Sequence, residues 1–239
     1  MAFHWVLDAF EPLTFDRLAV FVSARTDGSL DPDFGPDELR QRCSNFLVDD
    51  RDGNVQFVHA SASDFFSRYV DEDVLTGQFD PPTNHAKIAQ TCLQMLLNGD
   101  TMREIVPLAI GEFSSMRRKG RWSKSASPKA WATTYIFLSW PYHARDAGRQ
   151  VREEQMLSEN MASFLVSPQN PWEGDLGVLV DLLENVLILS CEREALAFIF
   201  PILGPEFNII LPICAFGFLE LLERPEISGQ INFLQELPL

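Results

Sequence analysis

Apolar positions recur every three or four residues along the first part of the chain, and the period changes to two near residue 46. Residues 2–10 carry such a stripe and predict a first helix. Thr14 precedes a second stripe and is expected to cap a second helix. Pro36, followed by two acidic residues, suits the first turn of a third helix. The pattern therefore predicts three helices before residue 46.

Residues 46–57 have the pattern of a two-stranded hairpin. An apolar run at 46–48 leads into a polar turn at 49–53, which ends in an Asp-Gly pair. Val55 and Phe57 then alternate with polar residues, as in a strand with one buried face. Three helices followed by such a hairpin predict a winged helix, with the hairpin as its wing.

The rest of the chain is predicted to be helical. Ser61 is expected to be the N-cap of a fourth helix, and residues 84–97 carry a further apolar stripe that ends at Gly99. Residues 102–113 are expected to form a short segment around Pro107. The basic, Ser-rich stretch 116–129 predicts an exposed insertion or a flexible loop. Residues 208–223, with small residues suited to close helix packing, are similar to a degenerate ankyrin-like helix pair.

We therefore expect a mainly α fold in three parts. Residues 1–75 form the winged-helix domain, with three helices and a two-stranded β-wing. Residues 76–170 form a helical linker region that contains the basic loop near 116–129. Residues 171–239 form a helical, ankyrin-like segment.

The net charge of −15 is unevenly distributed. Residues 26–80 carry 13 acidic and 4 basic side chains, and residues 153–239 carry 14 acidic and 2 basic. Residues 116–152 carry 9 basic and 1 acidic, so this segment is expected to pair with acidic regions of the chain or of a partner, or to form a solvated loop. A polyanion would be repelled by most of the surface, which makes nucleic acid an unfavoured partner.

Cysteine spacing and the N-terminal sequence narrow the class of protein further. The four cysteines are far apart, which fits neither a zinc site nor a disulfide framework and predicts buried free thiols. The first residues include His4, Asp8 and Glu11 and lack a basic stretch, so we expect no signal peptide. The uncharged run 207–219 is too short for a membrane span. We expect a cytoplasmic protein without a metal site or cofactor.

Three spaced motifs in the first 61 residues resemble one family. They are Trp5-Val6-Leu7-x-Ala9-Phe10-x-Pro12-Leu13-Thr14, Leu39-x-x-x-Cys43-Ser44-x-Phe46-Leu47 and Val55-x-Phe57-Val58-His59-x-Ser61. Together they are similar to the winged-helix segment of fungal NACHT-type (STAND) NTPases, which act in signal transduction. In that family the segment follows the nucleotide-binding domain and precedes a helical linker and often ankyrin repeats. The later Trp140-Pro141-Tyr142-His143 resembles the family's Trp-x-x-His element.

The resemblance implies a regulatory part of such a protein rather than its ATPase. The sequence has no Gly-x-x-x-x-Gly-Lys-Ser/Thr motif, so the loop that cradles phosphates is absent. A Gly-x-Ser-x-Gly nucleophile elbow is absent as well. We therefore expect a non-catalytic fragment or derivative that makes intramolecular or protein–protein contacts, with the nucleotide-binding domain supplied elsewhere.

His59 and Ser61 are the candidate site residues. In the wider family a winged-helix histidine contacts the diphosphate of bound ADP, and the resemblance puts His59 at that position, at a helix N-terminus suited to anions. The alternative is that His59 caps or packs locally. Ser61 is expected to act as an N-cap, and no His-Asp pair makes it a catalytic serine. His143 is expected either to line a pocket or to pack within an aromatic cluster.

Two function classes follow from these observations. The first is a non-catalytic regulatory and scaffold module of a signalling NTPase, supported by the order of the motifs. The second is a nucleic-acid-binding winged helix, supported by fold analogy and by the basic segment 116–152. Salt-dependent DNA binding separates them, because only the second class predicts it.

Overall fold

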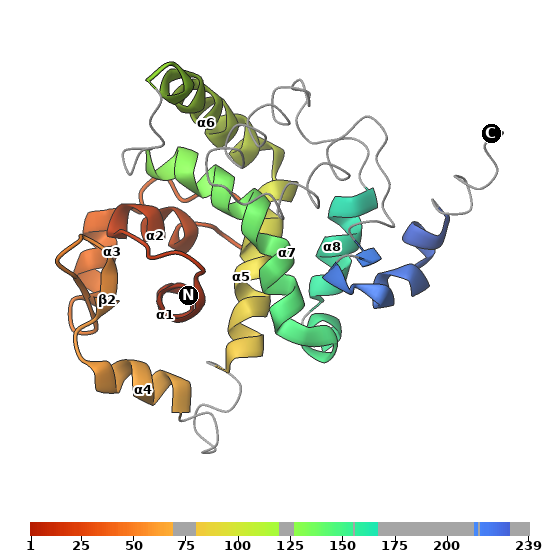
Figure 1. Ribbon diagram of the computed structural model, residues 1–239, viewed down its shortest axis with the longest axis horizontal. Coiled ribbons are helices and arrows are strands. Elements are labelled where there is room, and N and C mark those ends of the chain that lie inside the picture. Colours follow the sequence, from red (N-terminus) through yellow and green to blue (C-terminus); the bar gives the residue numbers. More distant parts are fainter. Residues whose placement is uncertain (69–79, 120–126, 155, 167–212, 215, 230–239) are drawn as a thin grey trace.

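The computed structural model describes residues 1–68, 80–119, 127–154, 156–166, 213–214 and 216–229. Across these residues the chain is mainly helical and has one small antiparallel sheet of two strands (Figure 1). The fold class is confirmed at this level, while the winged-helix and ankyrin-like assignments stay predictions. Both predicted internal boundaries, after residues 75 and 170, fall outside the described residues.

Residues 1–68 form an N-terminal unit of four helices and a hairpin. Its elements are α1 (Ala2–Asp8), α2 (Phe15–Val22), α3 (Pro36–Cys43), β1 (Leu47–Asp49), β2 (Val55–Phe57) and α4 (Ala60–Arg68). Two predicted helix starts are confirmed. The Thr14 hydroxyl accepts a hydrogen bond from the Arg17 N–H at 3.3 Å, and Pro36 occupies the first turn of α3.

The predicted hairpin is confirmed, and its strands lie within one residue of the expected positions. Leu47 faces Phe57 and Asp49 faces Val55 across the antiparallel pair. Gly53 has a φ of +81°, the left-handed conformation that glycine adopts without strain and that the tight turn requires. The Val55 N–H also donates to the Leu13 carbonyl at 2.6 Å, which ties β2 to the segment between α1 and α2.

A second group of helices packs against this unit. Its elements are α5 (Pro81–Leu97), α6 (Gly99–Lys119), α7 (Pro128–Glu154), α8 (Leu157–Val166) and a short 3-10 helix, η1 (Leu219–Glu223). Helices α5 and α7 lie side by side, with α1 and α2 on one side and α8 on the other (Figure 1). Asp80 caps α5 by accepting a hydrogen bond from the Thr83 N–H at 3.0 Å.

Several predicted boundaries were wrong. Helix α6 continues through Pro107. A proline removes one backbone hydrogen bond from a helix, and the packing of neighbouring residues holds the remaining turns together. The predicted loop 116–129 is shorter than expected, since α6 extends to Lys119 and α7 begins at Pro128. Helix α4 begins at Ala60, so Ser61 lies inside the helix and is not its N-cap. Helix α7 bends at Gly148, whose φ of +74° interrupts the helical geometry.

One hydrophobic core joins the N-terminal unit to the later helices. Trp5 of α1 is fully buried and stacks on Phe21 of α2, with ring centroids 4.0 Å apart. Both rings also contact Tyr135 of α7, at 5.7 and 5.5 Å. Burying these rings fixes the position of α1 and α2 on the α5–α7 pair.

The C-terminal part is described only over a short stretch. A buried ion pair joins it to the later helices: Arg152 Nε of α7 lies 2.5 Å from Glu220 Oε1 of η1, and Arg152 also donates to the Ala144 carbonyl at 2.9 Å. The predicted ankyrin-like pair at 208–223 lies partly outside the described residues, and its described part includes η1. No helix among the described residues is long and apolar enough to cross a membrane.

Candidate functional site

His59 precedes the first turn of α4 and acts as its cap. The Ser61 N–H donates to His59 Nδ1 at 3.1 Å, and the Ser61 hydroxyl lies 2.7 Å from the same nitrogen. A backbone N–H can only donate, so Nδ1 is the acceptor, the Ser61 hydroxyl also donates to it, and the ring N–H is on Nε2. His59 and Ser61 are both exposed. The structure brings the two candidate residues together and gives His59 the capping role predicted for Ser61.

An exposed apolar surface lies beside this cap. We call it the hairpin patch and define it as Phe46, Val48, Val58 and Phe65, whose exposed fractions are 45%, 37%, 53% and 43%. The Val58 N–H donates to the Phe46 carbonyl at 2.8 Å, so these two residues are neighbours. Phe65 belongs to α4, and the other three residues belong to the hairpin or flank its strands. Exposed apolar residues gathered in one region are typical of an interaction surface.

Aromatic rings below the patch hold it in place. Phe3 of α1 contacts Phe46, Phe57 and Phe66, with centroids 5.5, 5.8 and 4.9 Å apart. Phe66 also contacts Phe65 on α4 at 5.5 Å. The exposed rings therefore rest on a packed aromatic layer that connects α1, the hairpin and α4.

The cations of α3 are paired within the N-terminal unit. Arg40 forms an ion pair with Asp49 of β1, and its guanidinium lies 4.2 Å from the centre of the Phe15 ring. Arg42 forms an ion pair with Glu38 at 2.5 Å. A recognition helix needs cations aimed at bases and phosphates. Both arginines of α3 instead neutralise carboxylates of this chain.

The basic segment 116–152 is paired in the same way where its side chains are described. Lys129 pairs with Glu104, Arg145 with Asp146, and Arg152 with Glu220. Arg149 pairs with Glu153 at 2.8 Å and approaches Glu223 at 3.8 Å. The described cations of the basic segment thus pair with acidic groups of this chain, which is one of the outcomes expected for this segment from the sequence.

A cluster of rings surrounds the buried His143 of α7. We call Phe10, His85, Tyr135 and His143 the histidine cluster. His143 is fully buried, with Nε2 lying 2.8 Å from the Tyr135 hydroxyl and Nδ1 lying 2.8 Å from His85 Nδ1. The Phe10 ring stacks on His143 at 4.0 Å, and the Phe10 N–H donates to the Tyr135 hydroxyl oxygen at 3.1 Å. Of the two roles expected for His143, the structure therefore shows packing within an aromatic cluster.

The contacts of His143 suit a neutral ring. Two facing Nδ1 atoms form a hydrogen bond only when one nitrogen carries the proton and the other accepts it. Burial, together with the neighbouring His85, lowers the pKa of His143 to about 3. Burial also raises the pKa of Tyr135. These shifts favour a structural contact between α5, α7 and the end of α1 over an acid–base role near neutral pH.

A second buried contact joins α1 to α5. His4 Nδ1 lies 2.5 Å from Asn84 Oδ1, and the Asn84 amide donates to Asp8 Oδ2 at 2.6 Å. Burial lowers the pKa of His4 to about 4 and raises the pKa of Asp8. The sequence pattern does not indicate the roles of Asn84 and His85, because their partners lie 58 to 80 residues away along the chain.

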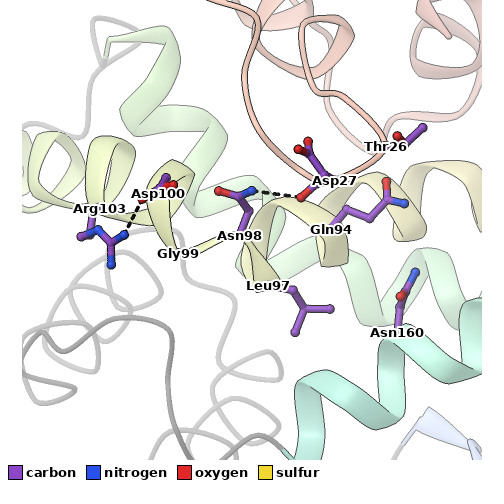
Figure 2. A pocket seen from close by; sticks show the side chains of 9 residues that line it. All are labelled: Thr26, Asp27, Gln94, Leu97, Asn98, Gly99, Asp100, Arg103 and Asn160. Atoms are coloured by element: carbon purple, nitrogen blue, oxygen red, sulfur yellow. Dashed lines mark hydrogen bonds and ion pairs between the residues drawn. The ribbon is translucent and has the colours of Figure 1, made fainter.

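A polar pocket of about 410 Å³ lies between the loop that follows α2, the α5–α6 junction and α8 (Figure 2). Asn98 uses both ends of its amide, donating to the Asp27 carbonyl at 3.0 Å and accepting from the Thr101 N–H at 2.9 Å. Arg103 forms an ion pair with Asp100. Asp27 accepts two hydrogen bonds from Ser29, which lower the pKa of its carboxyl. We therefore assign these groups to holding the loop in place.

The described residues offer no group of three or more His, Cys, Asp or Glu that is arranged to hold a metal ion. Cys43, Cys92 and Cys214 are free, but only Cys92 is buried, so the prediction of buried thiols is wrong for Cys43, which is half-buried, and for Cys214, which is exposed. Cys191 lies outside the described residues.

Comparison with known proteins adds no relative: no protein-family model, no curated protein and no solved structure matches the chain.

Proposed function

We propose that this chain is a non-catalytic regulatory and scaffold module of a NACHT-type signalling NTPase. It works through contacts with protein partners and with a nucleotide-binding domain supplied elsewhere. The proposal rests on the family-like motifs together with one structural observation, the exposed hairpin patch. A surface of this kind, held by a packed aromatic layer, gains free energy when a partner covers it.

The order of elements supports the winged-helix assignment. Three helices precede an antiparallel hairpin, and the Leu13–Val55 hydrogen bond draws the segment between α1 and α2 alongside β2. The nucleic-acid alternative loses support, because Arg40, Arg42 and the described cations of the basic segment form ion pairs within the chain.

His59 is the proposed nucleotide-sensing residue, and Ser61 is its positioning partner. The two hydrogen bonds from Ser61 engage Nδ1, so Nε2–H is the donor available for a phosphate oxygen. The N-terminus of α4 adds backbone N–H groups beside it. In the proposed complex His59 slows the release of ADP from the neighbouring domain.

The test uses a purified nucleotide-binding domain of a fungal NACHT-type NTPase, loaded with a fluorescent ADP. Adding the full chain is expected to slow ADP release at least about tenfold, a difference of about 1.4 kcal/mol. Phe46→Ser should abolish this slowing by removing part of the patch, whereas Leu219→Ser, which alters an exposed leucine of η1, should preserve it. Unchanged release on addition of the chain would contradict the proposed function.

A matched pair of variants separates sensing from capping. His59→Asn keeps a side chain that caps helices well but lacks the imidazole Nε2–H. His59→Ala removes both functions. Loss of ADP retention in His59→Asn, with an unchanged circular dichroism spectrum, would assign the effect to the nucleotide contact. If His59→Asn retains ADP as the original chain does, the sensing role is excluded.

A further inference from the structure

An apolar groove of about 550 Å³ runs between the N-terminal unit and the α6–α7 pair. One wall comes from α2 and the loop that leads into α3. The other comes from α6 and the start of α7. The apolar and small lining residues are Ala19, Val20, Leu30, Pro32, Phe34, Gly35, Pro36, Leu108 and Pro128. The groove is distinct from the hairpin patch, with which it shares no residue.

Leu108 is the exposed apolar residue on the α6 wall. Its exposed fraction is 45%, although it lies in the middle of a 21-residue helix. Glu104 and Glu112 lie four residues before and after it, so all three side chains share one face of α6 and line the groove. This face therefore presents an apolar contact with a carboxylate on each side.

The charged rim of the groove is predominantly acidic. Asp16 and Asp31 line the opposite wall, so four carboxylates stand against the single ammonium of Lys129. Lys129 pairs with Glu104, and Asp31 lies 3.4 Å from Arg25, an arginine that is itself more than half exposed. Glu112 accepts a hydrogen bond from the Ser127 N–H at 2.7 Å. The lining keeps a surplus of negative charge after these contacts.

We propose that this groove binds a segment of a protein partner that has a large apolar side chain flanked by lysines or arginines. The apolar anchor would occupy the space beside Leu108. An uncharged apolar segment would remove water from the carboxylates without replacing its hydrogen bonds, which is unfavourable. Flanking cations restore those contacts and gain from the surplus negative charge. Because the two walls belong to different parts of the fold, the bound segment bridges the N-terminal unit and the α6–α7 pair.

The test measures binding of fluorescein-labelled ten-residue peptides to the full chain by fluorescence anisotropy. The probe has a central Leu-Trp pair, two lysines on each side and Gly-Ser ends. It is expected to bind at micromolar concentration, and raising NaCl from 50 to 500 mM should weaken it several-fold, because salt screens exposed charges. Two comparison peptides replace either the lysines by glutamates or the Leu-Trp pair by Gly-Ser.

The expected result is that both comparison peptides bind at least about tenfold more weakly than the probe. Leu108→Ser and Glu112→Gln should each weaken probe binding about three- to tenfold, and Leu219→Ser should leave it unchanged. If the peptide that keeps its lysines but lacks the Leu-Trp pair binds as tightly as the probe, binding is only the general attraction of a basic peptide to an acidic protein. That result would overturn the proposal. Probe binding unaffected by Leu108→Ser would also overturn it. Neither outcome bears on the hairpin patch.

Discussion

The region around the hairpin and the buried core use the same residue types in opposite ways. His59 is exposed and bonds to a residue two positions away, while His143 is buried and bonds to residues 8 and 58 positions away. Phe46 is 45% exposed, while Phe21 is fully buried against Trp5. The buried core holds the fold together, and the hairpin is positioned by that fold while keeping its apolar side chains available to a partner.

The largest difference between the two regions should appear in matched phenylalanine truncations. Phe21→Ala leaves a cavity beside Trp5 and is expected to cost about 3–5 kcal/mol of unfolding free energy. Phe46→Ala removes a half-exposed ring and is expected to cost about 1 kcal/mol or less. Urea denaturation monitored by circular dichroism provides both values. Equal losses would show that the hairpin carries as much of the stability as the core does.

The Arg152–Glu220 ion pair extends the test of the core to the C-terminal stretch. Both side chains are about 5% exposed, so removing one partner leaves a buried charge uncompensated. Glu220→Gln is expected to cost about 3 kcal/mol. Glu223→Gln, which alters a carboxylate that is 75% exposed, should change the unfolding free energy by less than about 0.5 kcal/mol. Similar losses in the two variants would contradict the structural role assigned to the buried pair.

Lowering the pH should reduce the free energy of unfolding, because two histidines are buried in the core. The folded-state pKa values of His143 and His4 lie below the ordinary value of 6.5, so below pH 6.5 the unfolded chain binds more protons than the folded one. Stability therefore falls as pH decreases from 6.5 towards 4. Between pH 7 and 5 each histidine should contribute a loss of about 2 kcal/mol.

A variant isolates the contribution of one ring to this acid sensitivity. His143→Gln removes the titrating group and keeps a hydrogen-bonding side chain, so its stability loss between pH 7 and 5 should be about 2 kcal/mol smaller than that of the original chain. His59→Gln, at the exposed cap, provides the control. Identical pH profiles for His143→Gln and the original chain would refute the linkage.

Two glycines with the same φ of +81° compare a crowded backbone position with an open one. A Cβ added to Gly28 would lie 2.0 Å from the Gln94 carbonyl oxygen of α5, whereas a Cβ added to Gly53 in the hairpin turn would meet nothing within 4 Å. Gly53→Ala should cost about 1 kcal/mol from backbone strain alone. Gly28→Ala should cost at least about 1 kcal/mol more, because the backbone must also move. Thermal denaturation of the two variants tests this ranking.

Local signals in the sequence were enough to predict much of the N-terminal unit. The Thr14 cap, the Pro36 helix start and the Asp-Gly turn are each decided by neighbouring residues. Ser61 was a reasonable N-cap on the same grounds. The observed cap is His59, because the helix begins one residue before Ser61 and the imidazole reaches the Ser61 N–H.

The remaining errors concern features that depend on packing. Helix α6 persists through Pro107 because its buried side, including Ile105, Val106 and Ala109, packs into the core. The histidine cluster forms only where α5, α7 and the segment after α1 meet in space, and no spacing within one segment indicates that. The groove beside Leu108 likewise exists only where α2 and α6 approach each other.

Hydrogen–deuterium exchange of the full chain, measured with and without the ADP-loaded NACHT nucleotide-binding domain, tests the central claim most directly. In the chain alone, backbone amides of residues 44–62 should exchange faster than those of α5 and α7. Adding the domain should slow exchange at residues 44–62 at least about tenfold and leave exchange in α5 and α7 unchanged. No protection of 44–62, or protection confined to α5 and α7, would contradict the proposal that the hairpin patch is the docking surface.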